Sequence, residues 1–266
     1  MNNSTPRDQY SIIKIISIWL LAAAPMGILV YIINPIISPS YESDPFSAAI
    51  SRISLITTGL IWQFILSLII IRQEEGNMSW TTIKKRLRLN TPIDPKTGES
   101  SRKLWVWALV FIVLLATVIS MIGPILDTQW TSIFPILSPT PGSDFNELLA
   151  SSEILTRLVG NWSFFGLMLV MAVFNILGEE FIFRGVLLPK MEGVFGKYDW
   201  VVNGALMGAY HWHQPWTVPG AILASIICFS YPSKRFKSTY ISMAIHGFQF
   251  ILVIPMILLL VLGMGP

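Results

Sequence analysis

Two adjacent glutamates and an arginine follow a long apolar run in the second half of this chain. The segment Gly178–Arg184 reads GEEFIFR, and the residues before it, Trp162–Leu177, carry no charge. An unpaired charge at the centre of a membrane helix costs about 2.5–3.5 kcal/mol on insertion scales, so two carboxylates there need partners or a purpose. Glu180 and Arg184 are four residues apart, on one helix face, and are predicted to form an ion pair.

Glu179 is predicted to have a different role from its neighbour. It is rotated by about 100° from Glu180 around a helix, so we expect it to face a polar cavity. A carboxylate in a semi-apolar cavity can act as a general base near neutral pH. The competing interpretation is that Glu179, Glu180 and Arg184 only mark the cytoplasmic end of a helix, because charges commonly flank membrane spans.

The three histidines all lie in the apolar last third of the chain. His211 and His213 belong to the segment YHWHQPW, and His246 belongs to ISMAIHGFQF. Because His211 and His213 are about 200° apart around a helix, one is predicted to face the cavity of Glu179 and the other to point elsewhere. A lone histidine on an apolar helix is usually a packing residue, but two histidines and a glutamate on separate membrane helices favour a functional site.

The composition indicates residence in a membrane. Of the 266 residues, 53% are hydrophobic and 12% are charged, whereas soluble domains carry about 25% charged residues. A helix needs roughly 20 apolar residues to cross the bilayer. The runs that are expected to span are Ile15–Ile37, Ile53–Ile71, Leu104–Leu126, Trp162–Leu177, Trp200–Tyr210, Val218–Tyr231 and Ile241–Met264.

The positive charges predict the topology. With seven spans and a cytoplasmic N-terminus, 16 of the 18 Lys and Arg residues fall inside and only Arg52 and Arg157 fall outside, which is the distribution that membrane proteins prefer. The predicted fold is therefore an all-α, polytopic integral membrane helical bundle with a cytoplasmic N-terminus. It has seven transmembrane helices, or eight if the segment 127–160 contains a re-entrant piece.

Two polar segments divide the chain. The first, 72–103, is predicted to be a basic cytoplasmic loop, and its stretch Trp80–Leu89 is amphipathic. That stretch either lies on the inner membrane surface or is an ordinary solvated loop. The second, 127–160, is predicted to lie outside and to be helical from Asp144 to Leu158. We expect an N-terminal part, 1–160, that contains these loops and the first helices, and a C-terminal membrane core, 161–266.

Several kinds of site are excluded or disfavoured. Cys228 is the single cysteine, which excludes an internal disulfide and a thiolate zinc site. The sequence contains no HExxH or CxxC motif and no Gly-rich phosphate loop. No patch of the type that binds nucleic acid is present, and basic residues that face anionic lipid explain the net charge of +3.

The ordered motifs resemble a known family. EExxxR at Glu179–Arg184, a FxxxH-like motif at Met207–His211 and a later histidine, His246, all in apolar helices, are similar to those of the CPBP family of intramembrane proteases. This family is also called Abi, or the CAAX prenyl protease type II family. The resemblance covers roughly Trp162–Val261, so it assigns the catalytic-type core to the C-terminal part.

The resemblance implies catalytic roles for five residues. Glu179 and His211 would activate a water for attack on a peptide carbonyl, and His246 would stabilise the oxyanion. Glu180 and Arg184 would complete the motif. Met207 stands where the family usually has Phe, a substitution that changes packing little.

The last motif departs from the family at one position. An Asn usually follows its histidine by four residues, and here that residue is Phe250. The neighbouring Gln249 is the candidate oxyanion donor in its place. Loss of one such donor lowers rates by about 100- to 1,000-fold in other enzymes.

The resemblance implies an intramembrane endopeptidase that uses a glutamate-activated water on a membrane-tethered peptide, with or without a prenyl group. A metal-independent mechanism is favoured, and a catalytic zinc held by Glu179, His211 and His246 is the alternative. Two other functions stay open: an inactive scaffold or bacteriocin-immunity-type protein, suggested by Phe250, and a proton-coupled transporter, against which the lack of repeat symmetry argues. The protein is expected in the plasma membrane, in contact with the lipid bilayer and with no nucleic acid.

Overall fold

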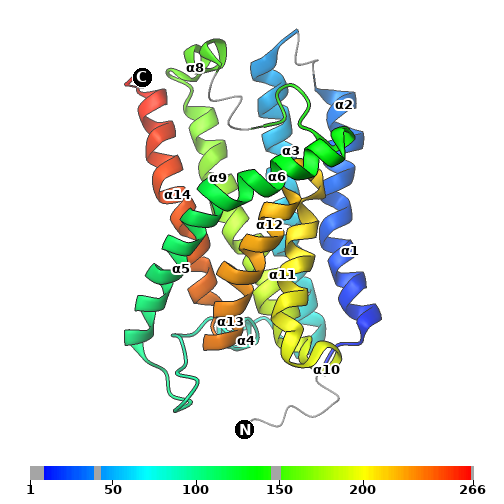
Figure 1. The fold of residues 1–266 in the computed structure, drawn as a ribbon, viewed down its shortest axis with the longest axis vertical. Coiled ribbons are helices and arrows are strands. Elements are labelled where there is room, and N and C mark those ends of the chain that lie inside the picture. Colours follow the sequence, from blue (N-terminus) through cyan, green and yellow to red (C-terminus); the bar gives the residue numbers. More distant parts are fainter. Residues whose placement is uncertain (1–8, 39–42, 145–150, 265–266) are drawn as a thin grey trace.

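The computed structural model describes residues 9–38, 43–144 and 151–264, and within these ranges it is helical and contains no β-strand. The long helices run side by side, and the first helix begins at the end of the bundle opposite to the one where the last helix ends (Figure 1). Among the described residues, five helices are long and apolar enough to cross a membrane: Ile12–Ile37, Pro45–Glu75, Arg102–Ile133, Trp162–Lys190 and Thr239–Val261. Many large apolar side chains are exposed along them, such as Leu109 and Leu252. Such surfaces match lipid rather than water, so the chain is a helical integral membrane protein.

Several of the long helices change their winding along their length. The first consists of α1 (Ile12–Ile28), the π-helical η2 (Leu29–Ile33) and α2 (Asn34–Ile37). The second is α3 (Pro45–Glu75), with Asp44 as its N-cap and Gly76 at its end in a left-handed conformation, φ 71°. The fourth consists of α9 (Trp162–Glu179), π-helical η6 (Glu180–Leu187) and η7 (Leu188–Lys190), and the last is α14 (Thr239–Val261).

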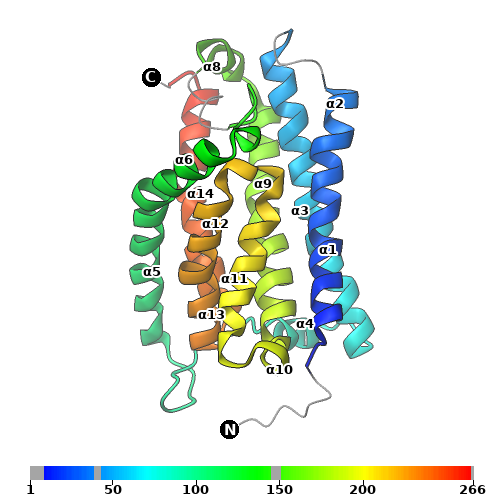
Figure 2. The same ribbon diagram turned by 45° about the vertical axis from the view of Figure 1, so that its right-hand side comes forward.

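The third long helix, which contains the predicted span Leu104–Leu126, bends along its length. It begins with η3 (Arg102–Trp105) and α5 (Val106–Thr117), widens in π-helical η4 (Val118–Ile122) and continues as α6 (Gly123–Ile133). Gly123 and Pro124 stand at the bend, and α6 then crosses the face of the bundle obliquely (Figure 2). The described part of 127–160 holds no further span. It contains the end of α6, η5 (Pro135–Leu137) and α8 (Ser152–Leu158), and part of the helix that was predicted from Asp144 lies outside the described residues.

Two shorter helices fill the middle of the bundle. They are α11 (Asp199–Tyr210) and α12 (Val218–Ala224), the second of which continues through η11 (Ser225–Ser230) into α13 (Tyr231–Phe236). The turns η9 (His211–His213) and η10 (Pro215–Thr217) join them, and α10 (Glu192–Phe195) and η8 (Gly196–Tyr198) precede them. They correspond to the two short predicted spans, but neither is among the five long apolar helices. The total of seven or eight spans and the cytoplasmic N-terminus therefore stay predictions.

The amphipathic stretch packs one of its faces against the bundle. Its helix α4 (Trp80–Arg86) lies beneath the bundle, at the end where α1 begins (Figure 1), and Leu87 and Leu89 belong to the main core. Arg86 is buried, pairs with Glu74 at 2.9 Å and donates to the carbonyl of Gly185 at 2.9 Å. Its apolar face and one of its cations therefore find partners inside the protein, while Trp80 and Lys84 are exposed. The contact of this stretch with the membrane surface or with solvent stays a prediction.

Glycines allow α11 and the helix from α12 to η11 to pack closely. A Cβ atom added at Gly208 would lie 2.3 Å from the Cα of Ile222, and one at Gly204 would lie 2.5 Å from the Cα of Ile226. Small residues at helix interfaces allow such close approach in membrane proteins. This contact positions the turn at His211, which follows α11 directly.

Replacing Gly208 by Ala is expected to lower the free energy of unfolding by about 1–3 kcal/mol, because the new methyl group meets backbone atoms that cannot yield. The measurement is unfolding in mixed detergent micelles. The control is Gly166→Ala, since a Cβ at Gly166 meets no atom within 4 Å and should leave the stability unchanged. Equal stability of the two variants would contradict the close packing of α11 and α12.

Candidate functional site

The two glutamates lie where α9 changes into the π-helical segment η6. Glu179 is the last residue of α9 and Glu180 the first of η6. Just before them, a Cβ at Gly178 would lie 2.5 Å from the carbonyl oxygen of Leu60, so glycine lets α9 approach α3 closely. Both glutamates are buried, with exposed fractions of 2% and 0%. The interpretation that they mark a helix end at the water interface is therefore wrong. Widened turns of this kind are frequent at functional sites.

Glu180 is held between a cation and a histidine. Its Oε2 lies 3.6 Å from the Nε of Arg184, four residues on, which is the predicted ion pair. Its Oε1 lies 3.0 Å from the Nδ1 of His246 on α14. Because an ionised carboxylate only accepts hydrogen bonds, His246 donates from Nδ1. Glu180 thus fixes the orientation of the His246 ring.

Arg184 is fully buried and contacts the residue that departs from the FxxxH pattern. One of its Nη atoms donates to the sulfur of Met207, and the hydroxyl of Ser225 lies 3.2 Å from the same sulfur. The guanidinium carbon also lies 5.2 Å from the ring centroid of Phe229. A thioether accepts hydrogen bonds weakly, whereas the edge of a Phe ring at position 207 would accept none. Met207 therefore does more than fill space.

Glu179 faces the cavities, as predicted. Its Oε1 accepts a hydrogen bond from the amide of Asn175 at 3.3 Å, and its Oε2 lies 3.9 Å from the Nε2 of His246. It lines two adjoining cavities, of about 620 Å³ and about 170 Å³. Asn175, His211 and Gln214 also line both of them. The carboxylate is thus in contact with internal space while the rest of the side chain is buried.

The two histidines of the HWH segment do not separate as predicted. The α-helix ends at Tyr210, and His211–His213 form a 3₁₀ turn, so the rotation of an α-helix does not apply. The rings stack, with centroids 5.6 Å apart and planes at 25°. His213 is buried and lines the smaller cavity, whereas His211 lines both. Both therefore contribute to the space around Glu179, and the expectation that one would point elsewhere was wrong.

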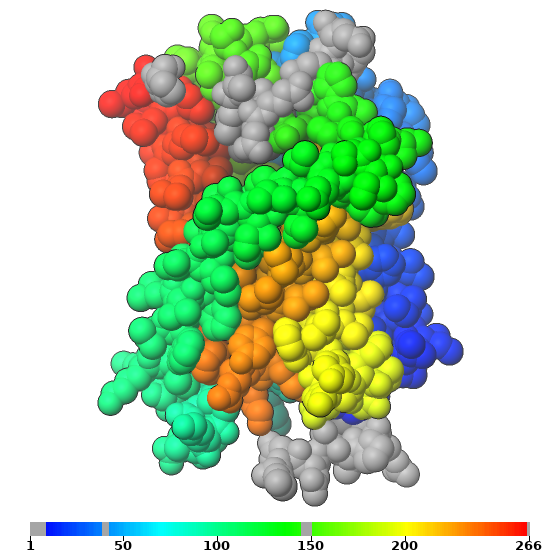
Figure 3. All heavy atoms as spheres, in the orientation of Figure 1, coloured from blue at the N-terminus to red at the C-terminus, as the bar shows by residue number. Residues whose placement is uncertain are grey.

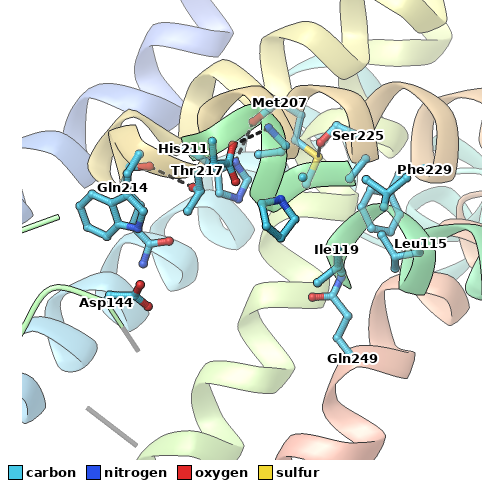
Figure 4. A pocket seen from close by; sticks show the side chains of 18 of the residues that line it. Leu115, Ile119, Asp144, Met207, His211, Gln214, Thr217, Ser225, Phe229 and Gln249 are labelled. Atoms are coloured by element: carbon cyan, nitrogen blue, oxygen red, sulfur yellow. Dashed lines mark hydrogen bonds between the residues drawn. The ribbon is translucent and has the colours of Figure 1, made fainter. Parts of the chain in front are cut away.

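A single hydrogen bond determines how His211 is presented. Its Nδ1 lies 3.1 Å from the carbonyl oxygen of Met207. A carbonyl accepts, so Nδ1 carries the proton, and the Nε2 of the neutral ring keeps its lone pair. His211 can therefore accept a hydrogen bond through Nε2. Figure 4 shows the ring beside Thr217 and Gln214, with the bond to Met207 on its other side.

Gln249 lies on the opposite side of the larger cavity. It comes from α14, three residues after His246, and in Figure 4 its amide group lies near Ile119. Gln249 lines the larger cavity, whereas Phe250 is not among the residues that line it. The amide and His246 therefore share one face of α14. Further walls come from η4, α6, η10, α12 and η11, and α6 crosses this side of the protein (Figure 3).

Sequence reasoning missed two polar residues of the site. Asn175 lies four residues before Glu179 and interrupts an apolar run, a signal that could have identified it as a partner of the carboxylate. Asp127 accepts from the backbone N–H of Gly220 at 2.9 Å and lines the larger cavity. No local pattern reveals it, because the bend at Gly123 brings it there.

Metal-ligating side chains do not cluster in the described part of the chain. Among residues 9–38, 43–144 and 151–264, no group of three or more His, Cys, Asp and Glu side chains is placed to hold a metal ion. Glu179, His211 and His246 surround the cavity without forming such a cluster. The histidine bonds described above instead suit a site in which protons move between a carboxylate, a water and a substrate.

Comparison with known proteins identifies part of the chain. Residues 161–252, about a third of the chain, match the family model described as Rce1-like, type II CAAX prenyl endopeptidase Rce1-like. The matched segment contains Glu179, Glu180, Arg184, His211 and His246. Searches of curated proteins and of solved structures found no match.

Proposed function

We propose that this chain, whose residues 161–252 belong to the type II CAAX prenyl endopeptidase family, is an active intramembrane endopeptidase. The observation that carries the proposal is the convergence of Glu179, His246 and His211 on one cavity inside the membrane bundle. These residues come from three separate helical segments. Such a set supplies a general base and hydrogen-bonding groups within reach of one substrate.

In the proposed reaction, Glu179 is the general base. Its carboxylate removes a proton from a water that also donates a hydrogen bond to the Nε2 of His211. The water oxygen attacks the peptide carbonyl carbon, and the carbonyl oxygen becomes an oxyanion. Glu179 then gives its proton to the leaving nitrogen as the C–N bond breaks, so the carboxylate is regenerated.

His246 and Gln249 are the proposed oxyanion donors. In its imidazolium form His246 donates from both nitrogens, to Glu180 from Nδ1 and to the oxyanion from Nε2. Gln249 donates its amide N–H in place of the family's Asn. Glu180 and Arg184 are positioning residues in this scheme, since they hold the His246 ring. Donors fixed in advance cost no reorganisation when the charge develops.

The function is tested by cleavage of membrane-tethered peptides, prenylated and unprenylated, by the purified protein in liposomes. Products are identified by mass spectrometry, with and without a chelator. Cleavage that survives chelation supports the glutamate mechanism, and loss of cleavage on chelation would favour the zinc alternative. If no peptide in the set is cleaved, the scaffold function that Phe250 suggests is favoured instead.

Replacing Gln249 by Ala is expected to lower kcat by about 100- to 1,000-fold with little change in KM, because one oxyanion donor is lost and ground-state binding is kept. The measurement is steady-state cleavage in liposomes. The matched control is Gln129→Ala on α6, since Gln129 lies outside both cavities. An unchanged kcat in Gln249→Ala would remove Gln249 from the proposed mechanism.

A further inference from the structure

Arg52 on α3 is a half-buried cation that lines the smaller cavity. Among the described residues none of the ion pairs involves it. A charged side chain within a membrane span is costly and normally pairs with another charge or serves a function. Arg157, the other cation predicted to lie outside, pairs with Asp44. Arg52 therefore stands apart from the remaining basic residue at this end of the protein.

The guanidinium of Arg52 is held in place but not saturated. Its Nη2 donates to the carbonyl of His213 at 2.9 Å, and its guanidinium carbon lies 5.9 Å from the ring centroid of Trp216. Its Nε is buried and has no hydrogen-bond partner among the described residues. A buried donor without a partner destabilises the protein. A ligand that accepts hydrogen bonds from the guanidinium would offset this penalty.

Arg52 and Glu179 line the same cavity, the smaller one. Leu60 lies level with Gly178, because its carbonyl would touch a Cβ there. Arg52 precedes Leu60 by eight residues, which is about 12 Å along an α-helix. An extended peptide covers about 3.3–3.6 Å per residue. An extended peptide would therefore need about three to four residues to reach from the level of Glu179 to the level of Arg52.

We propose that Arg52 binds a carboxylate of the peptide substrate while the scissile bond lies at Glu179. The planar guanidinium fork matches a carboxylate and can donate two parallel hydrogen bonds to it. The carboxylate is either the C-terminal carboxylate of the peptide or an acidic side chain. This inference rests on the proposed function and names the residue that selects among substrates. Arg52 is thus a specificity residue rather than a participant in proton transfer.

The test measures binding without turnover, in the Glu179→Gln background in micelles. The probes are fluorescent, farnesylated octapeptides in two matched pairs. One pair has a C-terminal carboxylate or a C-terminal amide. The other pair is amidated and carries a Glu or a Gln within the last four residues. The protein carries Arg52, or Arg52→Gln, or Arg52→Lys, with Arg157→Gln as the control.

With Arg52 present, the Kd of the charged member of one pair is expected to be about 10- to 100-fold lower than that of its neutral member. The ratio should fall to about one in Arg52→Gln and persist in Arg157→Gln. Arg52→Lys keeps the charge but lacks the planar fork, so it should retain part of the ratio. This variant provides the test if Arg52→Gln does not fold. The pair that responds identifies the source of the carboxylate.

Three results would overturn the proposal: no binding of any peptide, no charge-dependent ratio in either pair, or a ratio that Arg52→Gln leaves unchanged. A purely structural role of Arg52 would weaken both members of a pair equally. Because this test does not measure turnover, failure of the proposed protease function can be distinguished from failure of the Arg52 proposal. In that case carboxylate-dependent binding persists, but the protein with Glu179 intact cleaves none of the peptides.

Discussion

Replacing Glu179 by Gln is expected to lower kcat for peptide cleavage by about 100- to 10,000-fold, the contribution of a positioned general base. The amide keeps the size of the side chain and can still contact Asn175 and His246, whose distances from the Glu179 carboxylate are 3.3 Å and 3.9 Å. It cannot take a proton from water. The measurement is steady-state cleavage in liposomes, with the melting temperature in micelles as the test of folding.

The matched control is Glu153→Gln. Glu153 is an exposed glutamate on α8, away from both cavities, so its replacement should leave the rate unchanged. A Glu179→Gln variant that folds and cleaves at the wild-type rate would sink the general-base assignment. If Glu179→Gln is inactive only because it unfolds, its melting temperature will be far below that of the wild type. Glu179→Asp then provides a second probe.

Replacing Arg184 by Leu is expected to lower the free energy of unfolding by about 3–5 kcal/mol, the usual cost of leaving one member of a buried ion pair alone. Arg184 and Glu180 are both fully buried, at 3.6 Å from each other. Without the guanidinium, His246 is the remaining ion-pair partner of Glu180. The measurement is unfolding in mixed micelles.

The control for this prediction is Arg157→Leu. Arg157 pairs with Asp44 on the surface, where both side chains are partly exposed, so its loss should cost at most about 1 kcal/mol. The double variant Glu180→Gln with Arg184→Leu should recover part of the stability, because no uncompensated charge then remains. Equal losses for Arg184→Leu and Arg157→Leu would mean that the Glu180–Arg184 pair is not as buried as described.

Local features of the site could be predicted from the sequence. The pairing of Glu180 with Arg184 follows from their spacing of four on a helical turn, and the widened helix of η6 still brings them together. The membrane-spanning character of the long helices follows from their apolar composition. The family resemblance, which rests on short motifs, is confirmed by the match over residues 161–252.

Features that depend on breaks in helices or on distant contacts could not be predicted. His211 and His213 stack because the α-helix stops at Tyr210. Arg86 looked like one of many cytoplasmic charges, but Glu74 and the carbonyls of Gly185 and Val186 bind it. These partners are distant in sequence or carry no side-chain signal, so no local pattern indicates them.

Two helical irregularities shape the site. The π-helical segment starts at Glu180, and near its end Arg86 donates hydrogen bonds to the carbonyls of Gly185 and Val186. These hydrogen bonds stabilise the widened helix, because the last carbonyls of a helix have no partner within it. The bend at Gly123 directs α6 across the bundle, so that Asp127 reaches the N–H of Gly220 and closes one wall of the larger cavity. The site thus depends on the N-terminal half as well as on the segment that matches the family.

The most direct test of the central claim is hydrolysis of a membrane-tethered peptide in water labelled with ¹⁸O, in liposomes and with a chelator present. The account predicts that the wild type produces two fragments, that the new carboxyl group carries one ¹⁸O atom, that the rate is independent of the chelator, and that Glu179→Gln produces none of these fragments. Equal amounts of labelled product from the wild type and from Glu179→Gln would contradict the claim that Glu179 activates the attacking water.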